Sequence, residues 1–138
     1  MKKFLLDTHI LIWLSENKRK IDSGIVEDIE YFQYEYFISV ETLREIVILQ
    51  SNNKLQLDYS IDKIAKLIEH YNFTIINTEP KHIKTLEKLP ILHISNKAHD
   101  DPFDRLLISQ AISEKFTLIS ADKKFPYYTN LGLKLLEN

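Results

Sequence analysis

The chain has 138 residues, with 18 lysines and arginines against 20 aspartates and glutamates, a formal net charge of −2, and 44% hydrophobic residues. This length and composition predict one globular domain spanning residues 1–138. The lack of cysteine excludes disulfides, thiolate zinc sites and a cysteine nucleophile. Two glycines are too few for either glycine-rich phosphate-binding loop, which excludes nucleotide cofactors held in that way.

The N-terminal segment begins like a signal peptide, with two lysines followed by an apolar run. Asp7 and His9 interrupt that run, and no small-residue cleavage site follows Leu14. No apolar stretch approaches the roughly 18 residues that a membrane span requires. We therefore expect a cytoplasmic protein that does not associate with membranes.

Short apolar runs alternate with amphipathic segments along the whole chain. Five runs are short and rich in β-branched, leucine or aromatic residues, which predicts strands at 4–6, 36–38, 73–76, 116–119 and 133–136. Helical periodicity extends over 25–32, 61–68 and 103–111. The alternation predicts an α/β fold whose parallel sheet is covered by helices on both faces. Residues 89–100 break any periodicity and are predicted to form a long loop.

Acidic residues lie at the ends of predicted strands or at the starts of predicted helices. Asp7 follows the first strand, and Glu45 lies one turn into the helix after the second strand. Asp101 and Asp104 open the helix that leads into the fourth strand, and Asp122 follows that strand. Ligands of open α/β sheets bind at the carboxyl ends of the strands, so these acids converge if the first and fourth strands are neighbours.

Each acid also has a purely structural explanation. The segment Asp101–Asp104 fits an N-cap followed by proline and an acid in the first turn, and Thr42–Glu45 fits a capping box. Asp122 fits a surface turn. Asp7 is the hardest to explain in this way, because an unpaired carboxylate within an apolar segment is costly.

Carboxylates crowded into one volume repel one another, and a divalent cation relieves that repulsion. Ligands that offer only oxygen select Mg²⁺ or Mn²⁺. Such a site suits phosphodiester hydrolysis, because the metal lowers the pKa of bound water and offsets charge on the phosphate. The five histidines lack the spacing of a zinc site, and His9 is predicted to be packed or to cap a helix.

Four segments resemble the motif blocks of the PIN domain, and more closely those of the VapC-type toxins of bacterial toxin–antitoxin pairs. They occur in the family's order along nearly the whole chain, at residues 5–13, 39–46, 99–107 and 118–122. The third segment contains the run His-Asp-Asp-Pro-Phe-Asp-Arg-Leu-Leu, which is quite specific to this family.

The resemblance assigns roles to residues of this chain. The four acidic positions of the metal site are taken by Asp7, Glu45, Asp104 and Asp122. Asp101 is implied to lie near the metal or its waters, and Ser120 matches a hydroxyl position near the site. Arg44 stands where many relatives carry tryptophan, a departure expected to affect packing or the groove without touching a ligand.

The resemblance also implies a fold and a function. The expected fold is a three-layer α/β/α sandwich with a parallel sheet in the strand order 3-2-1-4-5, which places Asp7 and Asp122 side by side. The implied activity is that of a magnesium-dependent endoribonuclease, toxic when free and silenced by an antitoxin protein. The implied assembly is a homodimer whose active-site groove is covered by an antitoxin segment.

The distribution of charge is compatible with an RNA substrate. Without the five acids of the predicted site, 15 acidic residues remain against 18 basic ones. The expected RNA footprint is a modest basic patch formed by Lys81, Lys84, Lys88, Lys97 and residues 18–20. Residues 21–43 contain six acids, five aromatic residues and no lysine or arginine. This stretch fits a solvated helix followed by a buried strand, or a protein-binding surface.

Other classes of function fit the sequence less well. A PIN-like module that only binds protein would be favoured by a missing acid, and no acid is missing. A haloacid-type phosphotransferase needs a second aspartate where His9 stands, and a receiver domain needs a phosphoacceptor where Asn77 and Thr78 stand. A related DNA nuclease remains an alternative, although 138 residues leave little room for DNA-gripping segments.

Overall fold

A computed structural model describes residues 1–52 and 61–138. Its strands are β1 (Lys3–Leu6), β2 (Glu35–Ser39), β3 (Thr74–Ile76), β4 (Leu92–Ile94), β5 (Lys97–His99), β6 (Thr117–Ser120) and β7 (Lys134–Glu137). Its α-helices are α1 (Thr8–Glu16), α2 (Ser23–Glu30), α3 (Val40–Ser51), α4 (Ile61–His70), α5 (Pro80–Lys88) and α6 (Pro102–Glu114). Two 3₁₀ helices complete the description, η1 (Lys18–Lys20) and η2 (Phe125–Leu131).

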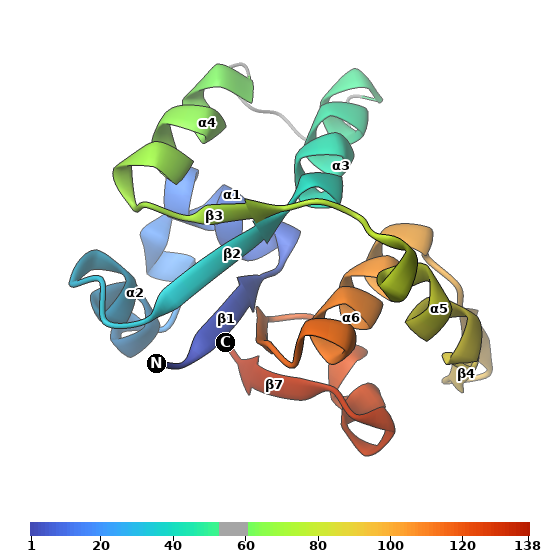
Figure 1. Cartoon of the computed structure of the whole chain (residues 1–138). Helices are drawn as coiled ribbons and strands as arrows, with labels where there is room; N and C mark the ends of the chain where they lie inside the picture. The colour runs from blue at the N-terminus through green and yellow to red at the C-terminus, as the bar shows by residue number, and fades with distance from the viewer. Residues whose placement is uncertain (53–60) are drawn as a thin grey trace.

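Five strands form a parallel sheet in the order β3-β2-β1-β6-β7, and Figure 1 shows β3, β2, β1 and β7 across it. Leu6 at the end of β1 pairs with Ile119 of β6, and Ser39 at the end of β2 pairs with Ile76 of β3. The predicted strand order is confirmed. Only the numbering differs, because β4 and β5 pair with each other outside this sheet.

Successive side chains of β1 point into opposite layers of the molecule, as the two-residue period of a strand requires. Phe4 and Leu6 belong to an apolar cluster that contains buried side chains of α1, α2, α3 and α4. Leu5 belongs to a second cluster with buried side chains of α6 and η2. Helices therefore cover both faces of the sheet, and the predicted three-layer α/β/α architecture is confirmed (Figure 1).

The helices at 61–70 and 102–114 lie where periodicity predicts them, but the helix expected to reach Phe32 ends at Glu30. Phe32 has a left-handed φ of 52°, and the N–H of Gln33 donates to the carbonyl of Asp28 (2.9 Å). This closure satisfies a carbonyl at the helix end. Phe32 continues the periodicity in the sequence but is 55% exposed.

The loop predicted at residues 89–100 contains a β-hairpin, so this expectation is wrong. Leu92 pairs with His99 and Ile94 with Lys97 in an antiparallel ladder. Ser95 and Asn96 form the two-residue turn with φ values of 53° and 63°, the type I′ geometry that suits the twist of a hairpin.

None of the helices formed by the described residues has both the length and the apolarity that crossing a bilayer requires.

Candidate active site

The ends of β1 and β6 bring Asp7 and Asp122 to the same edge of the sheet. Asp7 directly follows β1, and its N–H donates to the carbonyl of Ile119 in β6 (3.0 Å). The Ser120 hydroxyl joins the two acids, because it donates to Oδ2 of Asp7 (2.6 Å) and accepts the N–H of Asp122 (3.0 Å). The expected juxtaposition of Asp7 and Asp122 is present.

Asp7 is 6% exposed, and both of its carboxylate oxygens have partners. Oδ1 caps α1 by accepting the N–H of Thr8 (2.7 Å), while Oδ2 accepts the Ser120 hydroxyl. Burial raises the pKa of Asp7, and the hydrogen bonds from Ser120 and Thr8 oppose this rise because they stabilise the ionised form. These bonds offset the cost that an unpaired carboxylate would have at this position.

Glu45 reaches the same volume from the second turn of α3. Its Oε1 accepts a hydrogen bond from the hydroxyl of Thr8 (2.6 Å). The backbone N–H of the same Thr8 donates to Oδ1 of Asp7. Burial raises the pKa of Glu45, the hydrogen bond from Thr8 lowers it, and the carboxylates of Asp101 and Asp7 raise it further. Glu45 is therefore close enough to these acids to be influenced by their charge.

The predicted capping box Thr42–Glu45 is wrong. Helix α3 begins at Val40, and its N-cap is Ser39, whose Oγ accepts the N–H of Glu41 (3.1 Å). Ser39 ends β2 with an extended backbone, which is the conformation that an N-cap adopts. Thr42 lies inside the helix, so Glu45 has no capping role and its side chain is available to the site.

The start of α6 agrees with its prediction. Asp101 is the N-cap and accepts the N–H of Asp104 (2.9 Å), and Pro102 occupies the first helical position. The Oδ2 atom of Asp104 lies 3.0 Å from Nε2 of His99. Burial lowers the pKa of His99, which favours a neutral ring.

Asp104 lies within electrostatic range of the other four predicted acids. Burial, which is the largest cause, and the carboxylates of four residues together raise the pKa of Asp104 from 3.8 to about 8; in decreasing order the four are Asp101, Asp7, Asp122 and Glu45. A cluster with this much negative charge is suited to bind a cation. Within residues 1–52 and 61–138, no three of these five acids have carboxylate oxygens all within 4.8 Å of one another.

Residues 4–131 match the sequence profile of the PIN domain. The chain belongs to the PIN domain family. The fold of this PIN domain is similar to the folds of several solved structures. VapBC2 from Rickettsia felis, bound to a DNA fragment from its promoter, has a TM-score of 0.73 and 21% identity over 99% of this chain and 98% of that chain. VapBC-1 from nontypeable Haemophilus influenzae has a TM-score of 0.71 and 22% identity over 98% of this chain and 97% of that chain.

A third solved structure, FitAcB from Neisseria gonorrhoeae, has a TM-score of 0.61 and 15% identity to this PIN domain over 97% of this chain and 96% of that chain. At these identities the likeness is one of fold. None of the curated proteins matches the sequence significantly.

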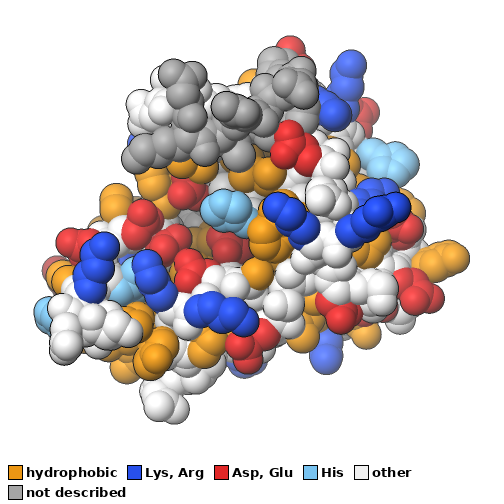
Figure 2. Space-filling model, turned by 180° about the vertical axis from the view of Figure 1, so that it is seen from behind, with side chains coloured by type: hydrophobic (Ala, Val, Ile, Leu, Met, Phe, Trp, Pro, Cys, Tyr) orange, Lys and Arg blue, Asp and Glu red, His pale blue; other side chains and the backbone are white. Residues whose placement is uncertain are grey.

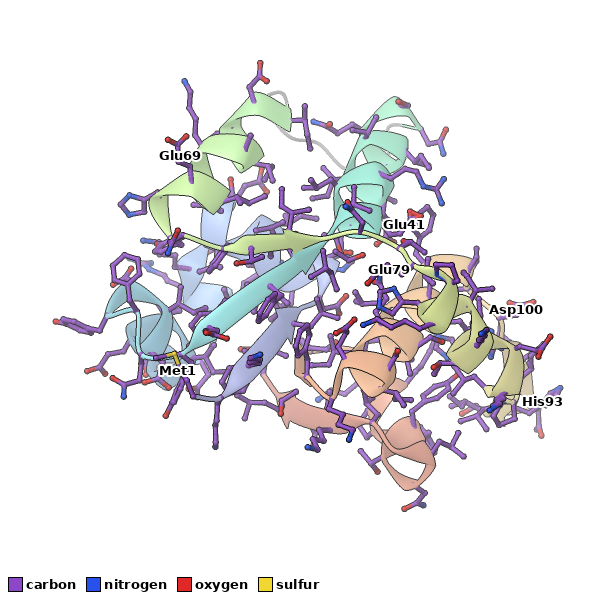
Figure 3. The ribbon with its side chains drawn as sticks, viewed as in Figure 1. Met1, Glu41, Glu69, Glu79, His93 and Asp100 are labelled. Carbon is purple, nitrogen blue, oxygen red and sulfur yellow. The ribbon has the colours of Figure 1, made fainter. Side chains whose placement is uncertain are left out.

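A different group of side chains in this PIN domain offers metal-ligand atoms within 4.8 Å of one another, namely Glu79, His82 and Glu114. The His82 ring is fully buried and accepts the N–H of Glu79 at Nδ1 (3.0 Å), while Nε2 lies 3.0 Å from Oε1 of Glu114. Lys81 Nζ lies 2.6 Å from the same Glu114 oxygen. Figure 3 shows Glu79 where α5 begins, beside α6. These polar contacts tie α5 to α6.

The group at α5 is separate from the acids at the sheet edge. Glu114 lies ten residues after Asp104 on the same helix, about 15 Å along its axis. Sequence reasoning did not single out this group, because its members come from positions 79, 82 and 114 and meet only through tertiary packing. The local spacing of Glu79 and His82 was the available signal.

His9 and Arg44 lie in the two helices that supply Asp7 and Glu45, and the sequence predicted a place for each of them. His9 is exposed within α1, whose N-cap is Asp7, so the prediction that His9 is packed or caps a helix is wrong. Arg44 forms an ion pair with Glu41 (3.1 Å), and its guanidinium lies 4.7 Å from the centre of the Phe103 ring. Arg44 therefore packs against the first turn of α6.

The predicted basic footprint is only partly available for binding. Lys18 forms an ion pair with Glu30 (2.9 Å), and Lys81 is paired with Glu114, whereas Lys97 is exposed. On the face seen in Figure 2, acidic side chains surround a hollow, and lysine and arginine side chains lie on either side of it. This distribution suits a polyanion whose phosphate backbone continues beyond a cation site.

Proposed function

We propose that this protein is a metal-dependent endoribonuclease that acts as the toxin of a toxin–antitoxin pair. The observation that carries the proposal is the convergence of acids at the carboxyl edge of the sheet, where the Ser120 hydroxyl joins Asp7 to Asp122 and the Thr8 hydroxyl donates to Glu45. In agreement with this, burial and four neighbouring carboxylates raise the pKa of Asp104 to about 8. These acids come from the ends of β1 and β6, from the second turn of α3 and from the start of α6. A cation relieves the repulsion among them.

In the proposed site, Asp7, Glu45, Asp104 and Asp122 hold Mg²⁺ or Mn²⁺, and Asp101 lies near the metal or its waters. The donor set fits a hard cation, because it offers carboxylate oxygens without thiolate. When bound, the metal supplies an activated water and offsets charge on the phosphodiester. The chain orients the ligands, since the hydroxyls of Ser120 and Thr8 donate to Asp7 and Glu45 respectively.

The proposed partners are an RNA substrate, a cognate antitoxin and a second copy of the chain. Several solved structures with the same fold are toxin–antitoxin complexes, which supports an antitoxin partner. Tyr31 and Phe32 are 74% and 55% exposed at the end of α2, and a groove of about 910 Å³ between η1 and α2 adjoins Tyr31. Aromatic side chains exposed beside a groove suit a protein partner, so we propose that the antitoxin contacts α2 in addition to the segment expected to cover the active-site groove.

Replacing Asp7 by asparagine tests the nuclease proposal. The asparagine side chain keeps the shape and one acceptor for capping α1 but removes a charge from the cluster. We expect the variant to fold and metal-dependent cleavage of RNA oligonucleotides to fall by more than about 100-fold. Asp28 is an acid on α2. The variant Asp28→Asn is therefore the charge-matched control, and it should cleave RNA as the wild type does. Cleavage that persists in excess chelator, or an Asp7→Asn variant that cleaves normally, contradicts the metal mechanism.

The same measurements address the alternatives. A non-catalytic binding module leaves RNA intact at every metal concentration while still binding the antitoxin. A DNA nuclease cleaves DNA oligonucleotides in preference to RNA of the same sequence. If a small protein is encoded beside the gene, co-expression with it, followed by light scattering on the purified sample, measures antitoxin binding and the number of chains.

A further inference from the structure

His99 ends β5 and lies between the sheet-edge acids and the second apolar cluster. Its ring is 4% exposed. The hairpin that carries it is fastened to α6, because the guanidinium of Arg105 donates to the carbonyls of Leu89 (2.8 Å) and Pro90 (3.0 Å) just before β4. His99 is therefore held in place from both sides, by the hairpin and by α6.

Both ring nitrogens of His99 have a partner. Nδ1 lies 2.7 Å from the hydroxyl of Tyr128, and Nε2 lies 3.0 Å from Oδ2 of Asp104. An ionised carboxylate only accepts hydrogen bonds, so Nε2 carries the hydrogen when Asp104 binds a cation. Nδ1 then accepts the hydrogen of the Tyr128 hydroxyl, which selects this tautomer.

Tyr128 is itself fully buried in η2, and its ring packs edge-on against that of His99 with centroids 5.5 Å apart. Phe125 of the same 3₁₀ helix is also fully buried and lies 6.4 Å from the His99 ring. The chain Tyr128–His99–Asp104 thus connects η2, β5 and α6. A carboxylate held through one oxygen in this way keeps the lone pairs of its other oxygen for a metal ion.

We propose that His99, held by the hydroxyl of Tyr128, is a positioning residue that fixes the carboxylate of Asp104 in the orientation required to bind the divalent cation. The proposal rests on the proposed function and extends it to two residues without a role in the acid cluster itself. In this proposal His99 acts on Asp104 as the hydroxyls of Ser120 and Thr8 act on Asp7 and Glu45, by donating a hydrogen bond that fixes the carboxylate.

The test compares variants of the full-length chain by Mn²⁺ titration calorimetry without RNA, with RNA cleavage measured in parallel. His99→Leu removes the donor, and we expect Mn²⁺ affinity to fall about 10- to 100-fold. His99→Gln places an amide N–H where Nε2 stands, and should restore affinity to within about threefold of wild type. Tyr128→Phe removes one hydroxyl and should lower affinity less than His99→Leu does.

Phe116→Leu is the control for packing, because Phe116 is 6% exposed in the same apolar cluster and stacks on Phe37 rather than on His99. It should lower the melting temperature and leave Mn²⁺ affinity unchanged. Wild-type affinity in His99→Leu, or an equal loss in His99→Gln and His99→Leu, overturns the proposal. If His99→Leu does not fold, unchanged affinity in Tyr128→Phe overturns it instead. A wild-type chain that binds no Mn²⁺ and cleaves no RNA refutes the proposed function rather than this inference alone.

Discussion

Replacing Asp104 by asparagine should stabilise the metal-free protein, and the gain should grow as the pH rises. The pKa of Asp104 is raised to about 8 in the folded chain, against 3.8 for an ordinary aspartate. Between these pH values the folded protein holds a proton that the unfolded chain releases, so wild-type stability falls with rising pH. Asparagine retains an oxygen that accepts a hydrogen bond from His99 but has no charge to bury.

The magnitude follows from the raised pKa. At about 1.4 kcal/mol per pH unit, the ionised carboxyl costs at most roughly 6 kcal/mol above pH 8. The Asp104 side chain keeps 22% of its surface exposed, and solvent relaxes much of this cost. We expect a gain of about 1–2 kcal/mol at pH 8 and a few tenths at pH 5. For 138 residues, 1 kcal/mol corresponds to about 3–4 °C in Tm.

The assay is thermal unfolding in EDTA at pH 5, 6.5 and 8, repeated with Mn²⁺. Asp28→Asn serves again as the matched control and should show no gain that depends on pH. With Mn²⁺ the order should reverse, because wild type gains stability from the bound metal and Asp104→Asn gains less. An Asp104→Asn variant that gains as much at pH 5 as at pH 8, or that is less stable than wild type at both, refutes the electrostatic reasoning.

Two further predictions concern other measurements. Mn²⁺ affinity should increase between pH 6 and pH 8, because the metal must displace the proton from Asp104, and calorimetry in buffers of different ionisation enthalpy should record proton release. Affinity that is independent of pH would contradict this. Asn96→Gly should stabilise the chain by about 0.5–1 kcal/mol in urea unfolding, because Asn96 has a φ of 63° that glycine adopts without strain. A loss of stability would contradict the type I′ turn.

The strands and their acids were predictable because their signals are local. Each strand of the parallel sheet contains a short apolar run, and Asp7 and Asp122 follow two of these strands within two residues. The start of α6 was predictable for the same reason, since its N-cap and its proline are adjacent in sequence. The capping box at Thr42 failed because Ser39, three residues earlier, competes for the same role and lies where β2 ends.

The remaining features depend on contacts between distant segments or on backbone angles. The turn at Ser95 and Asn96 lacks the Asn-Gly or Asp-Gly pair that signals a type I′ hairpin, so residues 92–99 were predicted to be a loop. His99 reaches Tyr128 across 29 positions of sequence. Periodicity contains no information about such a contact, which exists only because α6 and β6 return the chain to the same edge.

The helices that supply the acids also contribute charge of their own. α1 begins at Thr8, α3 at Val40 and α6 at Pro102, each beside an acid of the site or one turn before it. The N-terminus of a helix carries about half a positive elementary charge, because its peptide dipoles are aligned and its first N–H groups point outward. Three such ends directed toward one edge of the sheet form a positive field beneath the carboxylates. Together they supply about one and a half positive charges, which offset part of the negative charge of the acids and reduce the repulsion that a bound cation would otherwise have to balance.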